Sequence, residues 1–123
     1  METLYKIRDI RSDLQLLERD FEQKHGISFN EAMILCGLLG SERMSSGEIG
    51  ELIGQTRSNA SKIIASVERK GLIERGIGSD DKRRMYFVLT SRGRKLGEVV
   101  ERDGDMLAER LCAALDKKMR NRQ

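Results

Sequence analysis

The sequence predicts a mainly helical fold with one small antiparallel β-hairpin. Apolar residues recur every three or four positions over most of the 123 residues, which is the period of an amphipathic helix. The chain contains no proline, so long helices can run without interruption. Only around residues 84–89 does the apolar period change to two, which is typical of a half-buried strand.

The first helix is expected over residues 3–24. Its apolar positions form one narrow stripe, made of Leu4, Ile7, Ile10, Leu14, Leu17 and Phe21. Charged residues fill the other faces, and Gly26 follows the last turn as a typical terminator. A helix of this length with so narrow a stripe requires a partner helix along its length, from the same chain or from a second copy.

Two capping boxes predict the next two helices. The first, at residues 28–31, opens a helix to about Leu39, and the second, at residues 45–48, opens a short helix that stops at Gly54. The apolar residues expected to face inward are Ile34, Leu35, Leu38, Leu39, Ile49, Leu52 and Ile53.

A fourth helix is expected over residues 57–70, with Thr56 as its N-cap and Gly71 beyond its end. Together with the preceding short helix it forms a helix-turn-helix candidate over residues 46–70. Helical hairpins occur in many helical domains, so this pattern alone is a weak signal. Its buried stripe is expected to be Ala60, Ile63, Ile64 and Val67.

Residues 72–90 form the predicted hairpin. A short apolar run precedes a glycine-containing basic loop, and the alternating strand follows at residues 85–89. After Thr90 the helical period returns and continues almost to the C-terminus. The segment Asp103-Gly104-Asp105 either breaks this last helix or only weakens it, because an interior glycine costs about 1 kcal/mol.

The positive charge is concentrated in one block. The net charge is +3, but residues 57–95 carry 11 basic and 4 acidic side chains, whereas residues 1–56 carry 6 and 10. A local positive field of this kind suits an elongated polyanion, because it attracts and orients the protein. Taken alone, this charge distribution is explained equally well by a basic, solvent-exposed face that binds no partner. The structure into which residues 57–95 fold must therefore decide between the two explanations.

The face of the fourth helix opposite its buried stripe favours DNA contact. It holds small, hydrogen-bonding or basic side chains, namely Arg57, Ser58, Asn59, Ser61, Lys62, Ala65 and Arg69. Small residues let a helix sit deep in the major groove, where asparagine can pair with adenine and arginine or lysine with guanine. Serine hydroxyls and the helix N-terminus suit phosphate. A solvated helix without a partner would instead mix glutamate and lysine on this face.

The tip of the hairpin carries a second basic cluster, Lys82, Arg83 and Arg84. A basic tip beside the fourth helix can reach an adjacent minor groove, whose negative potential attracts an inserted arginine. Taken alone, the cluster is explained as well by a solvated edge loop.

These segments resemble the MarR family of winged-helix transcriptional regulators. The resemblance rests on residues 52–58, on Val67-Glu68-Arg69-Lys70-Gly71-Leu72-Ile73-Glu74-Arg75, on Asp81-Lys82-Arg83 and on residues 88–93. It covers about residues 10–96. It implies a winged helix-turn-helix fold and a homodimer. With only five aromatic residues in the chain, we expect no cofactor. The family commonly has a further helix after the long helix that follows the wing, and we expect that element to be shortened or absent here.

The resemblance also implies roles for individual segments and residues. Residues 1–25 and 91–123 would be dimerisation helices within a single winged-helix domain, and residues 28–90 would bind DNA, with the wing at 72–90. Arg83 would be the minor-groove arginine, and Asp81 the acid that orients the wing. The remaining DNA contacts implied by the resemblance are Arg57, Ser58, Asn59, Ser61 and Lys62, and from the residues themselves we expect Thr56, Lys82 and Arg84 to contact DNA as well. The partner would be a pseudo-palindromic double-stranded operator, and a small-molecule effector would act by changing the spacing of the two DNA-binding parts.

Other classes of function find little support. Two cysteines and one histidine cannot form a four-ligand zinc site. No nucleophile–base pairing is suggested, so we do not expect an enzyme. With no apolar run of about 18 residues and no signal peptide, we expect a cytoplasmic protein that does not enter the membrane. The main alternative is a winged-helix protein-interaction module that does not read DNA, which leaves the basic block unexplained.

Overall fold

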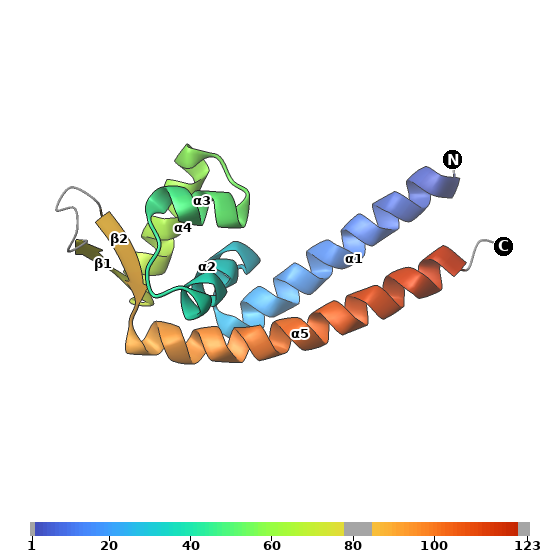
Figure 1. Cartoon of the computed structure of the whole chain (residues 1–123). Coiled ribbons are helices and arrows are strands. Elements are labelled where there is room, and N and C mark those ends of the chain that lie inside the picture. Colours follow the sequence, from blue (N-terminus) through green and yellow to red (C-terminus); the bar gives the residue numbers. More distant parts are fainter. Residues whose placement is uncertain (1, 78–84, 121–123) are drawn as a thin grey trace. The chain divides into compact units, whose positions relative to one another are not determined.

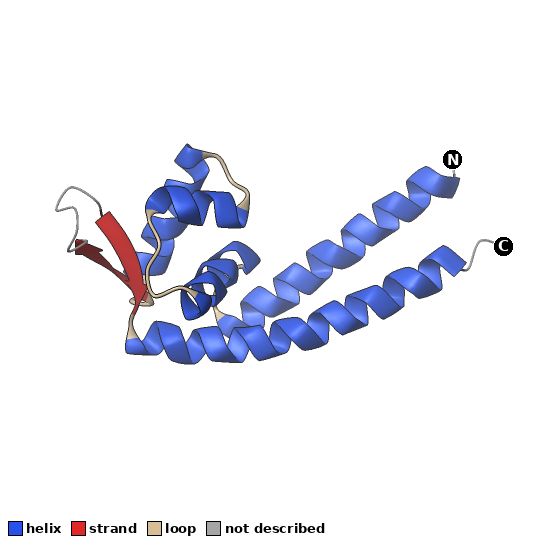
Figure 2. Ribbon diagram, viewed as in Figure 1, coloured by secondary structure: helices blue, strands red, loops and turns tan. Residues whose placement is uncertain are grey.

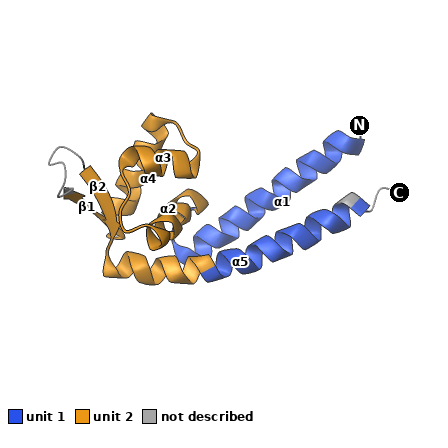
Figure 3. Cartoon of the chain, viewed as in Figure 1, with its two compact units in different colours: residues 1–28, 102–123 blue, residues 29–101 orange. Residues whose placement is uncertain are grey.

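The computed structural model describes residues 2–77 and 85–120 and has the predicted helical architecture (Figure 1, Figure 2). The elements, in chain order, are α1 (Glu2–His25), α2 (Phe29–Gly40), α3 (Ser46–Ile53), α4 (Arg57–Arg69), β1 (Ile73–Ile77), β2 (Met85–Leu89) and α5 (Ser91–Arg120). The prediction of a mainly helical chain with a two-stranded antiparallel wing is confirmed. The chain divides into two compact units, residues 29–101 and residues 1–28 with 102–123 (Figure 3).

The helix-turn-helix lies in the larger unit and is bounded by the predicted capping residues. Ser45 Oγ accepts a hydrogen bond from the Glu48 N–H, and the Glu48 carboxylate accepts one from the Ser45 N–H. The turn passes through Gly54 in the left-handed conformation, with φ of 63°, which glycine adopts without steric cost. Thr56 then caps α4 by accepting a hydrogen bond from the Asn59 N–H at 3.2 Å. Both of these capping predictions are confirmed.

The core of the larger unit is built by the four helices α2 to α5 and both strands. Its buried apolar residues include Ile34, Leu35, Leu38, Ile49, Ile53, Ala60, Ile64, Val67, Leu72, Ile73, Phe87 and Val100. The prediction that Leu52 faces inward is wrong, because its side chain is 43 % exposed. It lies over the backbone of Gly37 in α2, at the rim of the contact between α2 and α3. Within the short helix α3, only Ile49 and Ile53 are buried in the core.

The wing strands are held by a third backbone segment. β1 pairs antiparallel with β2, with Ile73 opposite Leu89. In addition, Met44 and Phe87 exchange both backbone hydrogen bonds, at 3.1 and 2.8 Å. This bridge fixes the loop between α2 and α3 to β2. The sequence did not predict it, because a pairing of single residues leaves no alternating pattern.

The hydroxyl of Thr90 connects the segment that follows α4 to the start of α5. Thr90 Oγ1 donates to the Gly71 carbonyl at 2.7 Å and accepts from the Gly93 N–H at 3.0 Å. Gly93 is buried, and a Cβ at this position would collide with the carbonyl of Leu72. The first turn of α5 therefore packs directly on the backbone that enters β1.

A buried carboxylate connects α2 to α4. Glu31 is 5 % exposed, and its carboxylate accepts hydrogen bonds from Ser66 Oγ at 2.7 Å and from Lys70 Nζ at 2.9 and 3.0 Å. A buried carboxylate needs such partners to offset its loss of hydration. The cluster therefore fixes α4 against the start of α2.

The smaller unit contains α1 and the C-terminal part of α5, which run antiparallel (Figure 3). Asp13 pairs with Lys118, and Asp103 Oδ2 lies 2.6 Å from His25 Nε2 and 3.3 Å from Lys24 Nζ. The helix α5 continues through Asp103-Gly104-Asp105 without a break, so this segment does not end the helix.

The predicted apolar stripe of α1 is buried only near its C-terminal end. Phe21 is 5 % exposed, whereas Leu4 and Ile7 are 64 % and 57 % exposed. Met106 on α5 is also 57 % exposed. The described part of a single chain therefore leaves much of the apolar surface of these two helices uncovered.

Candidate nucleic-acid interface

The exposed face of α4 carries the polar residues singled out in the sequence. One side of this helix is anchored in the core through Ala60, Ile64 and Val67. The predicted contact residues on and before its first two turns are all exposed: Thr56, Arg57, Ser58, Asn59, Ser61 and Lys62. The structure thus brings these six residues together on one accessible surface.

The charge of this surface is positive. The single acid in α4 is Glu68, and its carboxylate bonds to Arg75 of β1 at 2.9 and 3.1 Å. Arg57 and Lys62 form no ion pair within the described part of the chain. The backbone N–H groups at the start of α4 add partial positive charge at the same end. The surface can therefore bind an anion without first breaking an internal ion pair of these two cations.

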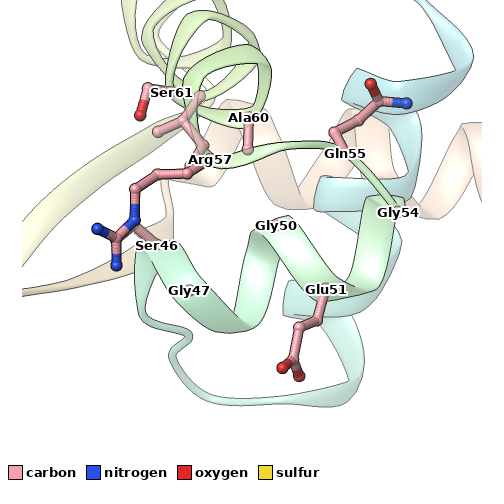
Figure 4. Close-up of a pocket in the computed structure, with 10 residues that line it drawn as sticks. Ser46, Gly47, Gly50, Glu51, Gly54, Gln55, Arg57, Ala60 and Ser61 are labelled. Atoms are coloured by element: carbon pink, nitrogen blue, oxygen red, sulfur yellow. The ribbon is translucent and has the colours of Figure 1, made fainter.

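Two adjoining hollows lie along one edge of this face. One, of about 330 Å³, lies between α3 and the first turns of α4 (Figure 4). Arg57 and Ser61 extend from α4 beside it, while the Glu51 carboxylate points away from α4 (Figure 4). A second hollow, of about 260 Å³, shares Ser61 with the first and reaches the wing strands at Met85. The two hollows also share Ser46 and Ile64, so they form continuous concave surface along one edge of the polar face of α4.

The base of the wing carries two arginines that the sequence analysis missed. The guanidinium of Arg43 lies 4.2 Å from the centre of the Tyr86 ring, and Arg75 lies on β1. Arg75 belongs to the basic block and could have been found there, but Arg43 lies within the acidic part of the chain and no local pattern indicates it. Gln55, which bonds to the Asn59 side chain, was also missed.

The predicted wing-tip residues Asp81, Lys82, Arg83 and Arg84 lie outside the described residues. Their roles therefore stay predictions. The strands on either side of them, β1 and β2, are described and form the hairpin that the sequence predicts.

No group of three or more histidine, cysteine, aspartate or glutamate side chains able to hold a metal ion occurs among residues 2–77 and 85–120. Within the same residues, no helix combines the length and apolarity needed to cross a membrane.

The observed features define a winged helix-turn-helix protein. Its second helix presents a polar and basic face, and a two-stranded wing follows it directly in the chain. Residues 25–84 match the sequence model of the MarR family. The match lies on the DNA-binding part expected from the sequence, so this part of the chain matches the MarR family of winged helix-turn-helix transcriptional regulators. Family members regulate transcription and are not enzymes, which confirms the prediction that this chain is not an enzyme.

Solved structures of other proteins share the fold. The chain is similar to S. aureus MepR in a complex with DNA, with a TM-score of 0.66, 24 % identity and coverage of 97 % of this chain and 99 % of that one. It is also similar to AdcR from Streptococcus pyogenes, with a TM-score of 0.73, 19 % identity and coverage of 94 % and 83 %. The reduced form of MarR from E. coli has a TM-score of 0.72, 18 % identity and coverage of 89 % and 81 %. No curated protein matches the chain by sequence.

Proposed function

We propose that this chain is a sequence-specific regulator of transcription that binds double-stranded DNA as a homodimer in the cytoplasm. In each protomer, α4 enters the major groove and the wing reaches the adjacent minor groove. The observation that carries the proposal is the exposed face of α4, which is polar and basic and whose one acid is bonded to Arg75. That MepR, a protein of similar fold, is found in a complex with DNA supports the same role here.

The side chains on this face match the chemistry of the major groove. Ser58 and Ser61 are small enough to let the helix approach the base edges, and their hydroxyls can donate to phosphate. Arg57 and Lys62 supply charge for phosphate or for guanine, and Asn59 supplies the carboxamide that suits adenine. Thr56, as the exposed N-cap, stands at the helix end that faces the DNA backbone.

The wing contacts are proposed from the family pattern that the sequence matches. Arg83 would insert into the minor groove, Asp81 would orient the wing, and Lys82 and Arg84 would contact phosphate. The basic block that contains these residues supports this assignment, because a positive wing tip is attracted to the duplex.

The homodimer is proposed to form through the terminal helices, residues 1–25 and 91–123, with residues 28–90 binding DNA. The exposed apolar side chains of Leu4, Ile7 and Met106 support this assignment, because a second copy would cover them. Two DNA-binding parts related by twofold symmetry fit a pseudo-palindrome with half-site centres about one helical turn apart. A small-molecule effector would act through a different affinity for two spacings of these parts.

Binding of duplex DNA at several salt concentrations tests the proposal. Sites selected from random duplexes should bind with a logarithm of affinity that falls linearly with the logarithm of salt concentration, by about 0.9 for each phosphate contact. Lys62→Gln should reduce this slope by about 1.8 for a dimer that loses one contact per protomer. Lys117→Gln, which removes an exposed cation from α5, serves as the matched control and should leave the slope unchanged.

Other results of these experiments would contradict the proposal. A salt-independent affinity, or no binding to any duplex, would exclude DNA recognition by this surface. A protein-interaction module would instead bind a protein partner even after Arg57, Lys62 and Arg83 are neutralised together.

A further inference from the structure

We infer that Gln55 is a positioning residue that holds the Asn59 side chain so that Asn59 selects adenine at one position of each half-site. This inference rests on the proposed function and deepens it by assigning one specificity determinant and the residue that orients it. Neither the family pattern nor the charge of α4 indicates this pair.

Asn59 is held at two points by the residues that precede α4. Its backbone N–H donates to Thr56 Oγ1 at 3.2 Å, and its side-chain Nδ2 donates to Gln55 Oε1 at 2.5 Å. Asn59 is nevertheless exposed and lies in the first turn of α4. An exposed side chain normally samples several rotamers and loses that freedom when it binds. The bond to Gln55 removes part of this cost before any DNA is present.

Gln55 itself is attached to a rigid turn. Its backbone N–H donates to the Gly50 carbonyl at 3.2 Å, and it follows Gly54, whose left-handed conformation reverses the chain. Figure 4 shows Gln55 in this turn, between the end of α3 and the start of α4. Its side chain is half-buried, whereas that of Asn59 is exposed. Gln55 is therefore suited to orient Asn59 from the protein side.

The direction of the hydrogen bond decides which base is matched. A carboxamide has one acceptor oxygen and two N–H donors. When one N–H of Asn59 is used by Gln55, the acceptor Oδ1 and the second N–H remain for the base. Adenine presents one acceptor and one donor in the major groove, N7 and N6–H₂, whereas guanine presents two acceptors. Asn59 oriented by an acceptor on Gln55 therefore matches adenine with two hydrogen bonds.

The experiment measures the affinity of the full chain for its selected operator and for duplexes in which each base pair is replaced in turn. The wild type should show one A·T pair per half-site whose replacement weakens binding by roughly 5- to 150-fold. Asn59→Ala should abolish this preference. Gln55→Ala should reduce it on the order of threefold or more at the same pair, with the preferences at other pairs unchanged.

A conservative variant and a double variant separate positioning from a merely structural role. Gln55→Glu leaves an oxygen that can only accept, so it should preserve the preference for adenine even though its negative charge weakens binding to every duplex. In the Asn59→Ala background, Gln55→Ala should cause no further change in base preference, because Gln55 acts through Asn59. Gln23→Ala, at an exposed glutamine of α1, should change no base preference.

Several results would overturn the inference. These are an equal loss of affinity for all four bases in Gln55→Ala, a changed preference at a different base pair, or effects of the two alanine variants that add. In each of these cases the wild type still binds DNA, so the proposed function stands and only the role of Gln55 fails. Failure of the wild type to bind any duplex would overturn the proposed function itself and this inference with it.

Discussion

Glu68 on α4 and Arg75 on β1 form an ion pair with two parallel hydrogen bonds, Nε to Oε2 at 2.9 Å and Nη2 to Oε1 at 3.1 Å. The planar guanidinium matches both oxygens of the carboxylate. The hydrogen bond and the charge of Glu68 raise the pKa of Arg75. The pair therefore offsets the one acid of α4 and connects that helix to the base of the wing.

Glu68→Gln removes this acid and leaves Arg75 without its ion pair. We expect DNA affinity at low salt to rise by roughly two- to fivefold, because one source of repulsion from the duplex disappears. The free energy of unfolding should fall only slightly, since the Arg75 side chain is exposed to solvent and an exposed ion pair contributes little. Titrations with DNA at two salt concentrations and urea denaturation measure both effects. Glu74→Gln, at an exposed acid of β1, is the control, and an equal loss of stability there would argue against the pair.

Glu31→Ala should destabilise the fold much more than removal of an exposed acid. The change removes the buried carboxylate that accepts hydrogen bonds from Ser66 Oγ and Lys70 Nζ, and we expect a loss of about 1–3 kcal/mol in the free energy of unfolding. Urea denaturation measures it, with Glu18→Ala in α1, at an exposed acid, as the control. A loss for Glu31→Ala no larger than for Glu18→Ala would show that the buried cluster contributes nothing to stability.

These two clusters also show where the sequence stops being informative. Periodicity and capping residues predicted every helix and the hairpin, because such signals depend on residues only a few positions apart. Glu31 and Ser66 are separated by 35 positions, and no local pattern indicates that they meet. The polar face of α4 was predicted in full for a similar reason, since all its members belong to one helix.

Leu52 and Arg43 are single residues whose contacts the local sequence pattern also does not predict. The helical period places Leu52 on the inward side of α3, but it does not indicate how closely α2 approaches. Because Gly37 of α2 has no side chain, Leu52 lies over its backbone, at the rim of the contact between α2 and α3. The stacking of Arg43 on Tyr86 depends on the bridge between Met44 and Phe87. That bridge brings together segments that are distant in the chain.

Two glycines of α5 should respond to alanine in opposite directions. A Cβ at Gly93 would collide with the backbone of Leu72, whereas nothing lies within 4 Å of a Cβ at Gly104. Gly93→Ala should therefore destabilise the fold by about 1–3 kcal/mol through overpacking. Gly104→Ala should stabilise it by about 0.5–1 kcal/mol, because alanine is the better helix former. Thermal and urea denaturation of the two variants provide the comparison, and each variant is the control for the other. The same sign of change in both would contradict the packing described at Gly93.

The carboxylate of Asp103 should make the free energy of unfolding depend on pH in the acidic range. The hydrogen bond with His25 is the main cause that lowers the pKa of Asp103, and Lys24 lowers it further. Because this pKa is lower in the folded chain than the ordinary value of about 3.9, the ionised carboxylate stabilises the fold above that pH. The contribution is lost as the pH falls through the lowered pKa.

Asp103→Asn should therefore be less stable than the wild type at pH 7, and the two should converge toward pH 3. Urea denaturation at several pH values between 7 and 3 measures the difference. Asp105→Asn, at an exposed acid two residues further along α5, should follow the wild type throughout. A constant difference between Asp103→Asn and the wild type over this range would show that ionisation of Asp103 does not contribute.

The exposed apolar residues of α1 should contribute to the interface of the proposed dimer. If a second copy covers them, Leu4→Ser combined with Ile7→Ser should weaken the dimer, because these side chains are 64 % and 57 % exposed in the single chain and gain burial only on association. Burying one such side chain contributes about 1.5–3 kcal/mol, so replacing two in each protomer should raise the dissociation constant of the dimer by at least about a hundredfold.

Sedimentation at several protein concentrations measures this dissociation constant. Met33→Ser, at an apolar residue of α2 that is 39 % exposed, should leave the dimer intact. If both protomers of the proposed dimer bind a duplex with two half-sites together, the double variant should also lose affinity for the full operator while its affinity for a single half-site stays close to that of the wild type. Unchanged dimerisation of the double variant would exclude this face of α1 from the interface.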